Sequence, residues 1–187
     1  MRLLPVSSPR LGVLAALLLV ACVRSAGAQG PITGGVAAAV DILFPMLTGV
    51  GTRPLDFGVI LPGETRVVIE PRTPSGGEFR IKGLKRRRSG DISFVLPARL
   101  TGPGGASIPL SFDGSFAAAC EIDATDVCRA ASLVTWNPVV TPVYRYVPSG
   151  ADKHDQLDLY LGGVALPAAT QPAGRYSGSI TVLITVN

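Results

Sequence analysis

"YSGSITVLITV", residues Tyr176–Val186, carries the pattern that decides the fold class of this 187-residue chain. Apolar residues alternate along it with positions that are mostly Ser and Thr. A period of two is typical of a β-strand with one buried and one exposed face. Because an apolar, β-branched segment needs cover from water, we expect it to close a core, with Ile180, Val182, Ile184 and Val186 buried.

Shorter apolar runs recur before this segment, and Gly, Pro, Asp and Ser separate them. No amphipathic helix of convincing length is present. Short strands at this spacing predict an all-β fold, either an antiparallel sandwich or a barrel. The candidate strands cover residues 36–46, 55–61, 65–71, 78–84, 91–97, 106–112, 156–166 and 175–186.

Three segments fit the strand pattern less well. Residues 117–136 could hold a helical turn, but we interpret them as a surface excursion stapled by a disulfide. The Pro-rich residues 137–155 are expected to be an extended loop or an edge strand. The Ala-rich residues 36–40 also suit a helix, and we favour a strand because Gly34, Gly35 and Pro45 flank them.

The first 28 residues have the pattern of a signal peptide. Arg2 and Arg10 supply a positively charged segment, and an apolar run follows at residues 11–23. Ala26 and Ala28 supply the small residues that a signal peptidase needs. We therefore expect export to the periplasm, the cell surface or the medium.

Cleavage after Ala28 leaves residues 29–187 as a single domain. An alternative stays open, because Leu19–Cys22 also fits lipoprotein processing, which would leave a lipid on Cys22. No later segment is apolar enough to span a membrane. The formal charge of the whole chain is +4, and loss of three signal-peptide arginines leaves 14 basic against 13 acidic residues, or +1. This balance gives no reason to expect a nucleic-acid partner.

Two cysteines remain after cleavage, Cys120 and Cys128. An even pair in an exported protein is most simply a disulfide, here closing a short loop, and two free thiols are the alternative. Such a bridge would stabilise the domain by about 2 to 3 kcal/mol.

Three stretches resemble a family of secreted bacterial pilin-like domains of largely uncharacterised function, similar in pattern to spore-coat U and fimbrial subunits. They are residues 55–71 (LDFGVILPGETRVVIEP), 77–84 (GEFRIKGL) and 166–186 (LPAATQPAGRYSGSITVLITV). The positions that match the LxFG and PAGxYxG patterns are Leu55, Phe57, Gly58, Pro172, Ala173, Gly174, Tyr176 and Gly178. These are mostly turn and core residues. The resemblance therefore implies an immunoglobulin-like or pilin-like antiparallel β-sandwich more than an activity.

The resemblance also implies how the last strand is covered. Fimbrial subunits of this kind are incomplete sandwiches, and a strand from a periplasmic chaperone or a neighbouring subunit fills the gap. In the alternative, residues 36–46 fold back and complete the sandwich, which gives a self-sufficient monomer. The chain departs from the family at the cysteine excursion, at the basic residues 82–90 and at Asn187, where many relatives end in an aromatic residue.

No residue constellation typical of catalysis is found, so we expect no enzyme activity and no cofactor. The single histidine, His154, has no recognisable nucleophile motif to serve, and we interpret it as a solvated loop residue. Glu121, Asp123 and Asp126 could gather around calcium. They lack the glycine and the downstream glutamate of a calcium loop, so no metal site is predicted.

A basic segment is the sharpest local feature. Two hypotheses explain it: a patch for an anionic envelope polymer or a partner's carboxylates, or a charged hairpin tip that protects a strand edge. The segment holds six of the mature chain's 14 cations, namely Arg80, Lys82, Lys85, Arg86, Arg87 and Arg88.

Trp136, Tyr144 and Tyr146 could form a platform on which a sugar stacks, but buried aromatic packing under a loop explains them more simply. Taken together, the sequence predicts an exported, non-catalytic structural or adhesive surface subunit of pilin type. The alternative is an envelope module that binds glycan or an anionic polymer.

Overall fold

The computed structural model describes residues 32–42, 48–83, 89–122, 127–148 and 156–187, so the predicted signal peptide lies outside the described residues. The all-β prediction is confirmed: this part of the chain forms strands and two short 3-10 turns and contains no α-helix. It therefore holds no helix that could cross a membrane. The strands are β1 (Ile32–Ile42), β2 (Thr48–Arg53), β3 (Leu55–Ile60), β4 (Val67–Ile69), β5 (Gly77–Lys82), β6 (Gly90–Val95), β7 (Arg99–Thr101), β8 (Ser107–Ser111), β9 (Ala117–Glu121), β10 (Val134–Trp136), β11 (Val143–Tyr146), β12 (Gln156–Leu161), β13 (Gly163–Ala165) and β14 (Gly174–Val186).

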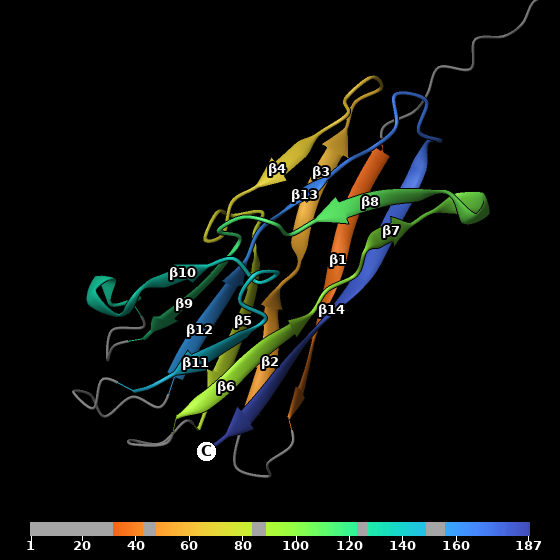
Figure 1. The fold of residues 1–187 in the computed structure, drawn as a ribbon. Coiled ribbons are helices and arrows are strands. Elements are labelled where there is room, and N and C mark those ends of the chain that lie inside the picture. The colour runs from red at the N-terminus through yellow and green to blue at the C-terminus, as the bar shows by residue number, and fades with distance from the viewer. Residues whose placement is uncertain (1–31, 43–47, 84–88, 123–126, 149–155) are drawn as a thin grey trace, which may run out of the picture.

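These strands form two sheets (Figure 1). One apolar core lies between them. The five-stranded sheet is antiparallel and has the order β10-β9-β12-β5-β2. The nine-stranded sheet has the order β11-β6-β14-β7-β8-β13-β4, with β1 beside β14 and β3 beside β1. Because β3 also contacts β4, this sheet is nearly closed and barrel-like.

The core confirms the predicted inward face of β14. Ile180, Val182 and Ile184 are fully buried, while Val186 is only partly buried. The five-stranded sheet contributes fully buried side chains from every second position of its strands, among them Phe79, Ile81, Leu157, Leu159 and Leu161. One apolar cluster therefore joins the two sheets.

The chain passes from the five-stranded sheet to the nine-stranded sheet through a closely packed connection at Gly162. β12 belongs to the five-stranded sheet and β13 to the nine-stranded sheet, with only Gly162 between them. A Cβ atom on Gly162 would overlap the backbone oxygen of Ile69 and lie 2.8 Å from the nitrogen of Pro71. Glycine is needed here because the turn after β4 approaches the backbone this closely.

All eight predicted strand regions contain strands, and the strand interpretation of the Ala-rich residues 36–40 is confirmed. The sequence predicts an extended loop or an edge strand for residues 137–155, and within them β11 is an edge strand that pairs only with β6 among the described strands; residues 149–155 lie outside the described residues. The interpretation of residues 117–136 as a surface excursion is wrong for β9, which lies between β10 and β12. Its Ala117–Cys120 segment is buried, and small side chains fit there because both faces of the strand are covered.

Candidate strand-complementation site

β1 is the strand that covers β14, and it lies between β14 and β3 (Figure 1). Its register with β14 runs without interruption from Ile32, opposite Gly174, to Ile42, opposite Ile184. The other side of β14 is occupied by β6 along its second half and by β7 near Ser177. The last strand is therefore covered on both sides from within the same chain.

The start of β1 lies directly over the core. Val36 is fully buried, whereas its neighbour Ala37 is exposed. A Cβ atom added to Gly34 would lie 3.2 Å from Cδ1 of Leu100 and 3.5 Å from Cβ of Phe57. The absence of a side chain at Gly34 thus lets β1 approach the core closely. The strand fills the seam, the space between β3 and β14, which would otherwise expose apolar side chains.

The pairing of β1 with β14 is parallel, so the prediction of a wholly antiparallel sandwich is wrong at this seam. β1 is antiparallel to β3, with a register shift at Gly34 and Gly35. An alternating pattern reveals which face of a strand is buried but is the same for both strand directions, so the sequence could not predict this. The arrangement gives β1 backbone hydrogen-bonding partners on both edges, which is the physical requirement for strand addition.

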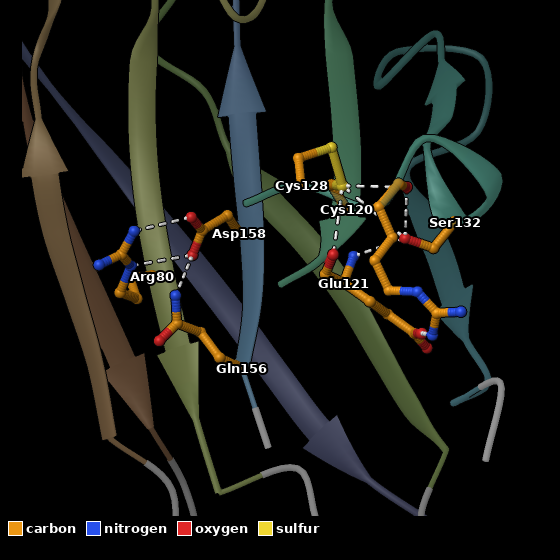
Figure 2. The surroundings of a disulfide bond; sticks show 8 residues. Arg80, Cys120, Glu121, Cys128, Ser132, Gln156 and Asp158 are labelled. Atoms are coloured by element: carbon orange, nitrogen blue, oxygen red, sulfur yellow. Dashed lines mark hydrogen bonds and ion pairs between the residues drawn. A yellow bond between two sulfur atoms is a disulfide. The ribbon is translucent and has the colours of Figure 1, made fainter. Parts of the chain in front are cut away.

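A second group of polar residues lies on the outer face of the five-stranded sheet. Nε and Nη2 of Arg80 each donate a hydrogen bond of 3.0 Å to Asp158, one to each carboxylate oxygen (Figure 2). Gln156 donates a third, of 3.3 Å, to the same carboxylate. Asp158 is only 2 % exposed although it points away from the core, because these side chains surround it.

Burial raises the pKa of the Asp158 carboxyl above its ordinary value, and the hydrogen bonds and charge of Arg80 oppose that rise. Burial also raises the pKa of the neighbouring Tyr160, with the negative charge of Asp158 as the next cause. The arrangement is an ion-pair network on the outside of a sheet rather than an acid and base aimed at a common point.

Two members of the predicted basic patch, Arg80 and Lys82, lie on this outer face, and Arg80 is held by Asp158. Lys85, Arg86, Arg87 and Arg88 lie outside the described residues. The hairpin-tip hypothesis is wrong in its geometry, because β5 pairs with β12 and β2 whereas β6 pairs with β14 and β11. The basic segment therefore connects two different sheets, and neither strand beside it is an edge.

The predicted disulfide between Cys120 and Cys128 is present, with the two Cα atoms 5.6 Å apart. Ser132 and Arg129 lie beside it, and the hydroxyl of Ser132 accepts a hydrogen bond from the backbone N–H of Glu121 (Figure 2). The bridge holds residues 127–133 against the outer face of β9, where Leu133 packs on a small cluster of Ala118, Cys120 and Tyr160.

The other candidate residues form no site in the described part of the chain. Glu121 accepts a hydrogen bond of 2.9 Å from the Tyr146 hydroxyl, while Asp123, Asp126 and His154 lie outside the described residues. Among described residues no group of three or more His, Cys, Asp or Glu side chains could hold a metal ion.

The aromatic residues pack inside the fold. Trp136 stacks on Tyr144, with ring centroids 4.4 Å apart and planes 19° apart, and both Trp136 and Tyr146 are buried. The ring centroid of Phe94 lies 6.1 Å from that of Trp136. Because Trp136 belongs to the five-stranded sheet and Phe94 and Tyr144 to the nine-stranded sheet, these contacts support the interpretation as packing.

No protein-family model matches the chain, and no curated protein is detectably similar to it.

Proposed function

We propose that this protein is an exported, non-catalytic surface subunit of pilin type whose own β1 serves as the complementing strand. The observation that carries the proposal is the insertion of β1 between β3 and β14, in parallel to β14 and with Val36 in the core. In fimbrial subunits of the family that the sequence resembles, a strand from outside fills the equivalent gap. Here the chain itself supplies the strand that the resemblance assigns to a partner.

A folded chain whose gap is filled internally needs no partner for stability, so the proposal describes a self-sufficient structural or adhesive unit on the cell envelope. The predicted signal peptide and the disulfide agree with an oxidising compartment outside the cytoplasm. The same seam would accept a strand from a chaperone or a neighbouring subunit whenever β1 is withdrawn.

The test uses the mature chain, residues 29–187, with Val36→Asp compared to Ala37→Asp. Val36 is fully buried and Ala37 is exposed, so the first variant places a charge in the core and the second places one in solvent. We expect the wild type and the Ala37→Asp variant to be folded monomers. We expect the Val36→Asp variant to unfold or to associate.

A synthetic peptide of residues 32–42 should bind a chain that lacks residues 29–42, and the same peptide carrying Val36→Asp should not. Isothermal titration calorimetry measures both. If the shortened chain keeps the stability of the full mature chain, β1 is not a complementing strand. If immunolabelling of native cells finds the protein only in the cytoplasm, the surface role is excluded.

A further inference from the structure

Arg72 lies in the turn between β4 and β5, and its side chain covers Tyr160 on the outer face of the five-stranded sheet. It is the one non-glycine residue with a positive φ, 66°, in the described part of the chain. A side chain in this left-handed region costs free energy, and such residues cluster at functional sites. Its guanidinium carbon lies 5.9 Å from the centroid of the Tyr160 ring, which is a cation–π contact.

The turn that carries Arg72 is firmly held. The Thr73 hydroxyl donates a hydrogen bond to the backbone oxygen of Glu70, and the Gly76 N–H donates one to the oxygen of Thr73. Nε of Arg53 donates another, of 2.8 Å, to the oxygen of Gly76. Since the preceding residues 69–71 also press against Gly162, Arg72 is positioned before any ligand arrives.

Arg72 also differs from the nearby arginines in its partners. Arg53 pairs with Glu78 at 3.1 Å, and Arg80 pairs with Asp158 at 3.0 Å. Arg72 makes no ion pair within the described residues, and its side chain is exposed. Its charge is therefore available to an external anion, while the carboxylates of the face are already bonded.

The register places these groups within reach of one ligand. Arg53 is opposite Glu78, and Glu78 is opposite Tyr160, so one row crosses three neighbouring strands. Two strand spacings, about 10 Å, separate Arg53 from Tyr160, and the Arg72 guanidinium lies over the ring of Tyr160. Arg80 and Lys82 follow on β5 in the next two rows of the same face.

We propose that this face binds an acidic polysaccharide, with the Arg72 guanidinium paired to a uronate carboxylate, Lys82 as a second exposed cation, and the carboxylate-paired Arg53 and Arg80 beside them. Arginine suits this role because its planar fork matches a carboxylate with two parallel hydrogen bonds. The inference goes beyond the structural role proposed above, since the face lies on the other sheet from the β1 seam.

The test measures binding of the mature chain to a galacturonic acid pentamer by calorimetry in 50 mM salt. We expect Arg72→Ala to weaken binding at least ten-fold, and Arg72→Lys to weaken it less. Arg99→Ala and Arg145→Ala are matched controls, because both residues are exposed and lie on the nine-stranded sheet, and each should change affinity less than two-fold.

Arg72→Gly separates binding from folding. Glycine accepts the positive φ without strain, which offsets the lost cation–π contact with Tyr160, so this variant should melt close to the wild type and yet lose binding as Arg72→Ala does. Equal losses in the control variants would show a diffuse charge effect and overturn the site. So would undetectable binding of the pentamer, or dextran sulfate binding as tightly as the pentamer with no dependence on Arg72. Failure of the β1 experiments would leave this prediction unaffected.

Discussion

Truncation of Ile184 to alanine tests whether β14 closes the core. The side chain is fully buried, and its partner across the seam is Ile42 of β1. Three carbon groups are removed, each worth about 0.8 kcal/mol of transfer free energy, and the cavity left behind adds about 1 kcal/mol. We therefore expect the free energy of unfolding to fall by about 3.5 kcal/mol, and the melting temperature by roughly 7 to 14 °C in a domain of this size.

Urea unfolding of the mature chain measures this loss, and an unchanged m-value shows that the folded and unfolded states are otherwise comparable. Ser179→Ala is the matched control, because Ser179 is exposed on the opposite face of the same strand, and its change should stay within about 0.5 kcal/mol. Equal and small losses in the two variants would mean that β14 is a mobile arm, and the reasoning from alternation to core would be refuted.

Two other perturbations have defined outcomes. Replacing both Cys120 and Cys128 by serine should lower the free energy of unfolding by about 2 to 3 kcal/mol in urea, and a reductant should then cause no further loss; a double variant as stable as the wild type would contradict this. For Asp158, whose pKa burial raises, the folded protein holds the proton more tightly than the unfolded chain, so ionisation opposes folding. The stability of the wild type relative to Asp158→Asn should therefore rise as pH is lowered from 7 and level off below about 3.9, and a fall over that range, seen in urea unfolding at each pH, would disprove it.

The sequence predicted strands where the side-chain period is clear. β14 has strict alternation over its second half, and its buried face was correctly identified. β9 was missed because Ala118 and Cys120 are covered by residues 127–133, so the strand is buried on both faces and shows no alternation. β2 was missed because its sequence, TGVGTR, offers a single apolar side chain.

The two polar contacts on the outer face of the five-stranded sheet join distant parts of the sequence. Arg80 and Asp158 are 78 residues apart, and nothing in the local sequence of either residue indicates the other. The same holds for Arg72 and Tyr160, which meet because a turn after β4 passes over β12. The cations of the basic segment can be identified from the sequence, but only the register of β5 shows that Arg80 lies among carboxylates on a sheet face.

The parallel seam also constrains how the protein assembles. Ile32 pairs with Gly174, 142 positions later, so β1 cannot dock until nearly the whole chain is available. Pairings of such long range form slowly, because the entropy of closing the loop is lost before the contacts are gained. Until β1 docks, the edges of β3 and β14 that face it have no strand between them. If the proposed strand exchange with an outside partner takes place, the interval before β1 docks is when the outside strand would compete with β1.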